Sequence, residues 1–241
     1  MRRSKLLAIL ATVMLVTGLA AMLDRAGAVD ERILSYTVDP RSEDLAFYWK
    51  DDRGQIIRSI QNLKTLVEGN KQKLVFAMNG GMYDPDNTPQ GLFIQHFKTL
   101  TPLDTAAGNG NFYLKPNGVF YLTQDREAVI CTTPDFRDSG QVEFATQSGP
   151  MLVIDGRIHP AFREGSNNLH IRNGVGILPG NKVVFAISET EVNLHDFARY
   201  FQSLGCQNAL YLDGFVSRMY LPEKNRWQTD GNFGVMIGVT E

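Results

Sequence analysis

The stretch GVGILPGNKVVFAISETEVNLHDFARYFQSLGCQNALYLDG, residues 174–214, carries the clearest structural signals in the sequence. Two apolar runs flank Pro-Gly-Asn at 179–181, which predicts an antiparallel hairpin. Apolar residues then recur at helical spacing between Asn193, a favourable N-cap, and Gly205, a residue that commonly ends helices. The mostly apolar segment NALYL, residues 208–212, completes a strand–helix–strand unit, whose two strands are most often parallel within one sheet.

Polar residues follow both strands of this unit and precede its hairpin. Glu189 follows the first strand, and Asp213 follows the last one. Because parallel strands end at the same edge of a sheet, the two carboxylates are expected at one rim. Counting outward from the hairpin turn puts Arg172 about opposite Glu189, with His170 close by. The sequence therefore predicts that these four side chains meet.

A second buried strand ends in an unusual way, within VFAMNGG, residues 75–81. The apolar run is followed by Asn79, Gly80 and Gly81, although a plain turn needs only one such pair. Paired glycines allow a backbone to approach a ligand closely. If this strand runs parallel to the other two, Asn79 and the glycines belong to the same rim.

Strand-like runs dominate the remaining chain. Asp155-Gly156 and the turn residues 116–118 predict two further hairpins, and a second helix is expected between Ser59 and Gly69. Neither an internal repeat nor a flexible linker is visible, so residues 29–241 are predicted to form one domain. The expected fold class is α+β, with a mixed, largely antiparallel sheet and a few packed helices.

The composition is that of an ordinary globular protein. The chain has 241 residues, of which 43% are hydrophobic and 21% are charged. That length suffices for a substantial core. The net charge is −2 and no basic run occurs, which argues against a nucleic acid as partner.

Residues 1–28 are predicted to be an export signal. Basic residues at 2–5 precede an apolar run over 6–23, and small residues at 26–28 suit a signal peptidase. An uncleaved N-terminal anchor is the alternative, because about 18 apolar residues approach the length of a membrane span. Both interpretations put the domain in the periplasm or elsewhere outside the cytoplasm. Membrane contact is expected only through an uncleaved leader.

Cysteine and metal chemistry are weakly indicated. Cys131 and Cys206 would be able to pair in an oxidising compartment, but the sequence does not place them within bonding distance. Asp84 and Asp86, next to the Asn-Gly-Gly turn, make calcium an alternative, although their spacing lacks the full ligand set of a known loop. We therefore expect neither a metal nor another cofactor.

The chemistry of the predicted rim suits a phosphate-linked sugar. Two carboxylates beside one glycosidic bond serve as acid and base, or as acid and nucleophile. An arginine holds a phosphate or carboxylate through two parallel hydrogen bonds. An asparagine amide holds a sugar hydroxyl or an oxyanion, and glycine turns present backbone N–H groups to an anion.

Four short motifs also follow one another in an order typical of one family. They are NGGMY at 79–83, SGP at 148–150, HIRNGVG at 170–176 and ALYLDG at 209–214. In this respect the chain resembles the phosphodiester glycosidases over roughly residues 70–240. That family includes a lysosomal enzyme that removes N-acetylglucosamine from a mannose-6-phosphate diester, and its bacterial members are mostly exported.

The resemblance implies which residues form the site, and two departures limit it. Many members continue the aspartate with glycines and serines, where this chain has Phe215 and Val216, and many carry threonine in place of Asn173. Phe215 would narrow the pocket, so the reaction type is expected to hold while the best-known substrate is not. The resemblance implies site roles for Asn79, Gly80, Gly149, His170, Arg172, Asp213 and Gly214.

We therefore predict an exported hydrolase that cleaves a glycosidic bond in a sugar phosphodiester or an envelope polysaccharide. Asp213 is the leading catalytic carboxylate, Glu189 is the second one, and Arg172 holds the anionic group. The alternative is a non-catalytic envelope protein that binds glycans during polysaccharide assembly or export. A carboxylate pair about 5–10 Å apart beside the arginine would favour the enzyme. The predicted substrate-binding residues are Asn79, Gly80, Gly81, Gly149, His170 and Gly214.

Overall fold

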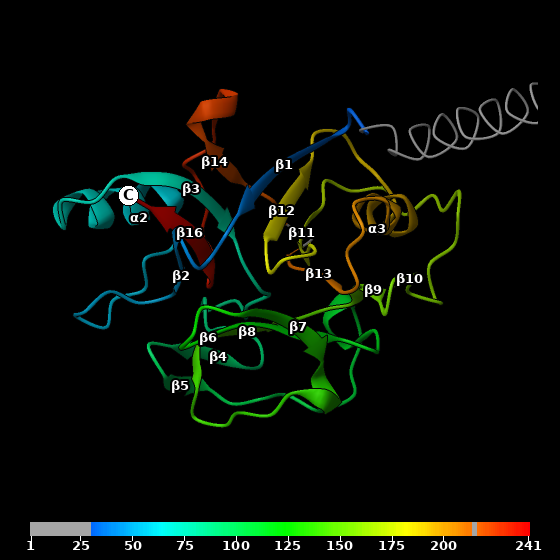
Figure 1. Cartoon of the computed structure of the whole chain (residues 1–241), viewed down its shortest axis with the longest axis horizontal. Helices are drawn as coiled ribbons and strands as arrows, with labels where there is room; N and C mark the ends of the chain where they lie inside the picture. The colour runs from blue at the N-terminus through cyan, green and yellow to red at the C-terminus, as the bar shows by residue number, and fades with distance from the viewer. Residues whose placement is uncertain (1–29, 214–215) are drawn as a thin grey trace, which may run out of the picture. The chain divides into compact units, whose positions relative to one another are not determined.

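The structure, a computed structural model, describes residues 30–213 and 216–241. One compact unit, Arg32–Glu241, holds all of the strands and helices given below (Figure 1). The predicted leader and the predicted site residue Gly214 lie outside the described residues.

The first sheet has six strands in the order β1-β12-β11-β13-β9-β10. As predicted, β12 and β13 run parallel, but β11 lies between them and is antiparallel to both. The predicted connecting helix is α3 (Leu194–Ser203), and the Asn193 side chain accepts a hydrogen bond from the N–H of Asp196 at its start. The strands are β1 (Ile33–Val38), β9 (Met151–Ile154), β10 (Arg157–Ile158), β11 (Asn173–Ile177), β12 (Val183–Ser188) and β13 (Ala209–Tyr211).

The second sheet has five strands in the order β15-β14-β3-β16-β2. Helix α2 (Ile60–Gly69) begins after Ser59, as predicted, and packs against this sheet. Strand β3 pairs antiparallel with β14 and β16, so the condition set for Asn79, that its strand runs parallel to β12 and β13 in one sheet, is not met. The strands are β2 (Asp44–Tyr48), β3 (Leu74–Asn79), β14 (Met219–Leu221), β15 (Arg226–Trp227) and β16 (Met236–Thr240).

The third sheet has five strands in the order β5-β4-β8-β6-β7. The predicted hairpin at 116–118 is wrong, because Asn111–Tyr113 form the 3-10 helix η1 instead of a strand. The buried amide of Asn117 donates to Phe112 O and holds this loop in place. The other elements are β4 (Phe93–Gln95), β5 (Lys98–Thr101), β6 (Gly118–Thr123), β7 (Ala128–Thr132), β8 (Val142–Ser148), η2 (Thr133–Asp135) and η3 (Pro222–Lys224).

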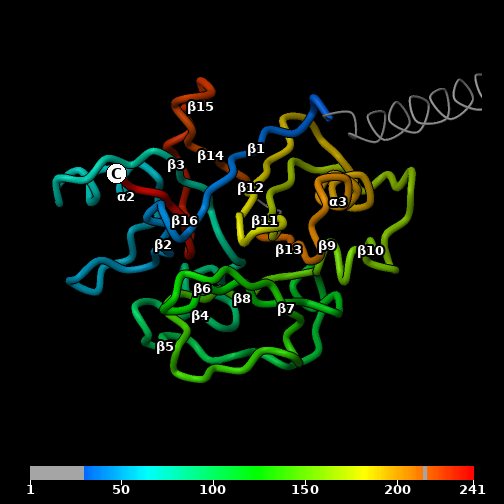
Figure 2. Tube along the Cα trace, viewed as in Figure 1, coloured from blue at the N-terminus to red at the C-terminus, as the bar shows by residue number. Residues whose placement is uncertain are grey.

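One aromatic core joins the three sheets, which Figures 1 and 2 show around a common centre. The ring of Phe185 on β12 lies 5.1 Å from that of Phe76 on β3 and 6.0 Å from that of Phe120 on β6. Phe47 on β2 lies 5.0 Å from Phe120. The fold is therefore α+β and largely antiparallel, as predicted, but it is built from three sheets where one was expected.

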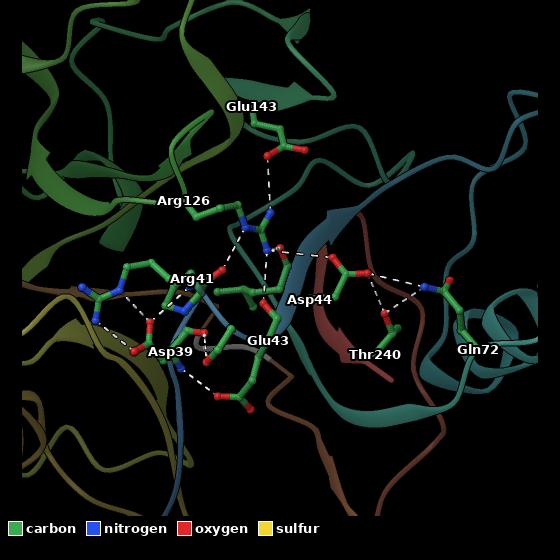
Figure 3. A network of polar contacts seen from close by, with 11 residues as sticks. Asp39, Arg41, Glu43, Asp44, Gln72, Arg126, Glu143 and Thr240 are labelled. Carbon is green, nitrogen blue, oxygen red and sulfur yellow. Dashed lines mark hydrogen bonds and ion pairs between the residues drawn. The ribbon is translucent and has the colours of Figure 1, made fainter.

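Arg126, in the turn between β6 and β7, fastens the third sheet to the β1–β2 turn (Figure 3). Its Nε donates to Pro40 O at 2.9 Å and its Nη2 donates to Leu45 O at 3.0 Å. Two carboxylates neutralise the guanidinium, Glu143 at 3.3 Å and Asp44 at 3.9 Å. This joint combines hydrogen bonds to backbone carbonyls with neutralisation of the guanidinium charge.

Candidate active site

The side chains of Asn79 and Asp213 meet between the first and second sheets. Asn79 ends β3, Asp213 follows β13, and Asn79 Nδ2 lies 3.5 Å from Asp213 Oδ2. Asn79 Oδ1 accepts a 2.8 Å hydrogen bond from the backbone N–H of Arg218, which turns the amide nitrogen toward the carboxylate. The carboxyl ends of β3 and β13 are therefore adjacent, as predicted, although the two strands belong to different sheets.

Asn173, the first residue of β11, ties these two residues together. Its Nδ2 donates to Asn79 O at 3.0 Å, and its Oδ1 accepts from the N–H of Asp213 at 3.0 Å. Its backbone O accepts from the N–H of Leu212 at 3.2 Å. The sequence showed Asn173 only as a departure from the family pattern. The structure shows it as a fully buried clamp between two sheets.

A cavity of about 560 Å³ opens beside Asp213. Tyr83 contributes an aromatic ring, and burial, with the charge of Asp213, raises the pKa of Tyr83 to about 12. Its hydroxyl therefore stays protonated at neutral pH. Asp84 adds an exposed carboxylate to the same cavity, whereas Asp213 is only 6% exposed. The described lining residues are Met82, Tyr83, Asp84, Pro85, Asn87, Gln90, Asp213, Val216 and Asn232.

The glycines next to this pair allow close packing. A Cβ on Gly80 would lie 2.6 Å from a methyl carbon of Val235, and a Cβ on Gly81 would clash with Thr146. A Cβ on Gly149 would lie 2.7 Å from Cβ of Asn117. Packing thus explains why glycine stands at these positions, and the proposed contact of their backbone with a substrate stays a prediction.

The predicted register, with Arg172 opposite Glu189, is wrong by one residue. Leu178 N–H donates to Lys182 O at 2.8 Å, so the hairpin loop has three residues and Arg172 lies opposite Ser188. A shift of one residue reverses the face on which a strand side chain lies. Glu189 is instead half-exposed, with its carboxylate 3.6 Å from the guanidinium of Arg226.

His170 and Glu189 line a second cavity, of about 510 Å³. Arg218 and Arg226 also line it, and Val216 forms part of the wall of both this cavity and the one beside Asp213. The structure therefore divides the predicted rim between neighbouring cavities.

Arg172 faces a third cavity, of about 220 Å³. Its Nε donates to Val192 O at 2.7 Å, and its Nη1 donates to the hydroxyl of Tyr211 at 3.0 Å. Its Nη2 donates to both O and Oδ1 of Asn168, at 2.8 and 3.1 Å. Burial raises the pKa of Tyr211 to about 12, an effect that the nearby Arg172 charge opposes and the Asp213 charge adds to. Tyr211, the last residue of β13, therefore connects the arginine to the segment that carries Asp213.

The remaining expectations concern metals, thiols and the membrane. Among the described residues, no group of three or more His, Cys, Asp or Glu side chains is placed to hold a metal ion. Asp86 accepts from the N–H of Thr88 within its own turn. Cys131 and Cys206 are free thiols. Within residues 30–213 and 216–241, none of the helices is long and apolar enough to span a membrane.

Comparison with known proteins identifies the family to which this chain belongs. Residues 72–240 match the phosphodiester glycosidase family, and the chain therefore belongs to that family. It is also 38% identical over 191 residues to "Uncharacterized protein YigE" of Escherichia coli, an alignment that covers 78% of this chain and 74% of the relative.

Two solved structures share the fold. The first is the catalytic domain of zebrafish N-acetylglucosamine-1-phosphodiester alpha-N-acetylglucosaminidase, auto-inhibited by its pro-peptide. It has a TM-score of 0.56 and 13% identity, with 90% of this chain and 86% of that chain covered. The second, a Burkholderia pseudomallei protein described as exported, has a TM-score of 0.55 and 10% identity, with 86% and 73% covered.

Proposed function

We propose that the protein is an exported hydrolase that cleaves a glycosidic bond in a sugar phosphodiester or an envelope polysaccharide. The observation that carries this proposal is the buried Asp213, held by Asn79 and Asn173, in the wall of a cavity with room for a sugar. Membership of the phosphodiester glycosidase family supports the reaction type. Likeness to the Burkholderia protein described as exported supports a place outside the cytoplasm.

The cavity offers a carboxylate pair that differs from the predicted one. Asp84 lines the same cavity as Asp213, whereas Glu189 lines the neighbouring one. Two carboxylates on either side of a glycosidic bond hydrolyse it with retention or inversion, according to their separation. We therefore assign Asp213 as nucleophile or general acid and Asp84 as its partner, with Tyr83 against the sugar ring.

A non-catalytic glycan-binding protein is the second candidate function. The observation that favours it is the position of Glu189, whose carboxylate pairs with Arg226 outside the Asp213 cavity. Under this alternative the adjoining cavities hold successive sugar units, and Asp213 accepts hydrogen bonds from hydroxyl groups without breaking a bond.

Hydrolysis of N-acetylglucosamine-1-phospho-mannoside and related sugar phosphodiesters by the full chain tests the proposal. Asp213→Asn is expected to lower kcat/KM by roughly 1,000-fold and Asp84→Asn by roughly 100-fold, the range typical of a lost general acid or base. Glu68→Gln, an exposed carboxylate change on α2, is the matched control and should retain full activity. Sugar binding without turnover by folded protein would replace the hydrolase with the glycan-binding alternative.

A further inference from the structure

We propose that the cavity around Arg172 is an anion-binding site that takes a phosphate or a carboxylate group. Binding at this site stands apart from the proposed hydrolysis. Only the identification of the anion as part of a substrate rests on the proposed function.

The first argument is the unbalanced charge of Arg172, which is only 1% exposed. An arginine guanidinium keeps its positive charge in proteins. All four of its hydrogen bonds go to neutral acceptors, on Val192, Tyr211 and Asn168. In the part of the chain that the structure describes, no carboxylate oxygen lies within 4.0 Å of this guanidinium. A buried charge without a carboxylate in direct contact is costly, and a bound anion would supply the missing ion-pair partner.

The second argument is the lining of the cavity. His195 also lines it, and His195 Nδ1 is buried without a hydrogen-bond partner among the described residues. The nearest carboxylate to that nitrogen belongs to Asp196, at 3.8 Å. Arg163 and Ser166 add a second guanidinium and a hydroxyl. No acidic residue is found among the described lining residues, so the donors and the charges together favour an anion.

The third argument is the size and position of the space. A volume of about 220 Å³ holds one phosphate or carboxylate with several waters, since a water molecule takes about 30 Å³. His195 lies in the first turn of α3, where the helix dipole adds partial positive charge. These features are secondary to Arg172, whose one remaining N–H, on Nη1, would donate a charge-assisted hydrogen bond to the anion.

The site lies close along the chain to the candidate catalytic carboxylate, which follows β13. Tyr211 contacts Arg172, and Asp213 is two residues farther along the chain, or about 7 Å at the spacing of an extended strand. An anion held by Arg172 is therefore either the charged group of a substrate whose sugar lies beside Asp213 or a separate small anion. Both sources present the same chemistry to the cavity.

Titration of the full chain with inorganic phosphate, and separately with acetate, tests the site. We expect either anion to raise the unfolding midpoint and to shift the Arg172 Nε–H signal in arginine-labelled NMR spectra. Arg172→Met should abolish the rise in the unfolding midpoint. Because a buried substitution can also disturb the fold, His195→Gln and Arg163→Gln provide the second test, and each should weaken binding roughly tenfold. Arg157→Gln, an exposed arginine on β10, is the control and should bind like the parent.

The proposal is overturned if neither anion changes the midpoint or the signal, or if both partial variants bind as tightly as the parent. Asp213→Asn should still bind phosphate, so failure of the hydrolase and failure of the anion site are separable. Competitive inhibition of sugar phosphodiester cleavage by phosphate would identify the anion as part of the substrate. Binding without competition would overturn that link and identify a separate anion.

Discussion

Arg126 and Arg172 both hold loops together through backbone carbonyls, yet their surroundings differ in charge. Arg126 has Glu143 at 3.3 Å and Asp44 at 3.9 Å beside its carbonyl partners. Arg172 makes as many hydrogen bonds but has neutral partners only. The first is a neutralised joint between sheets, whereas the second has only neutral bonding partners among the described residues and lies next to a cavity. The contrast shows that four hydrogen bonds to the protein do not by themselves make an arginine structural.

The largest stability effect is expected at neither arginine but at Asn173. Asn173→Leu would leave Asn79 O and the N–H of Asp213 buried without partners, at a cost of about 3 kcal/mol in the free energy of unfolding. Urea denaturation measures this loss. Asn173→Thr is the matched control and should lose less, because a hydroxyl replaces one of the two bonds. A stable Asn173→Leu variant would mean that the pair is held by other contacts.

Arg126→Met tests the structural arginine. Loss of its bonds to Pro40 and Leu45 and of its ion pairs should lower the free energy of unfolding by about 2 kcal/mol. Phosphate affinity should not change, because none of the residues that Arg126 bonds lines the Arg172 cavity. Arg53→Met, in an exposed turn, is the control for loss of a surface charge. If Arg126→Met weakens phosphate binding instead, the contrast between the two arginines fails.

The pH dependence of stability tests the surroundings of Tyr211. Its pKa of about 12 in the folded chain exceeds the value of about 10 for an unfolded tyrosine. Between these two pKa values the unfolded chain releases the Tyr211 proton and the folded chain keeps it. The contribution of protonated Tyr211 to the free energy of unfolding is therefore full below pH 10 and is lost as pH rises toward 12. Between pH 10 and pH 12, Tyr211 should lower the free energy of unfolding by about 1.4 kcal/mol per pH unit.

Tyr211→Phe should flatten this part of the profile, measured as urea midpoints across the alkaline range. Other groups with raised pKa values, among them Tyr48, Tyr83 and Cys206 at about 12, keep the remaining slope. Identical slopes for the parent and the variant would show that Tyr211 ionises in the folded chain as it does in the unfolded one.

Arg172→Met should have the smallest effect on stability in a chloride buffer, less than about 1 kcal/mol, because relief of a buried charge offsets the lost hydrogen bonds. The parent should become more stable when phosphate is added, and the variant should not. Unfolding curves with and without phosphate measure both quantities. A large loss in chloride alone would make Arg172 a structural residue like Arg126.

Local signals in the sequence predicted the elements around the site well. The N-cap Asn193, the hairpin residues and the apolar spacing of α3 act over a few positions, so their consequences are visible in one stretch. The meeting of Asn79 with Asp213 was also predicted, although through an incorrect strand arrangement. In each case the residue types restrict the local backbone strongly.

Features that depend on distant partners were not predictable in the same way. Strand β3 joins the second sheet because β14 and β16, near the end of the chain, pair with it. The register at Arg172 depends on whether the hairpin loop has an odd number of residues, and the positive φ angles of Gly180 and Asn181 allow three. The clamp by Asn173 requires both sheets to be in place, so neighbouring sequence carries no signal for it.

The bonds of Asn173 also have a consequence for the order of folding. They join residues 94 and 40 positions apart, and the contact between Asn79 and Asp213 spans 134 positions. Contacts between such distant positions carry a large loop-closure entropy and slow the folding of a chain. The carboxylate–amide pair is thus expected to assemble among the last contacts, and a chain with only one sheet formed would contain no partial version of it.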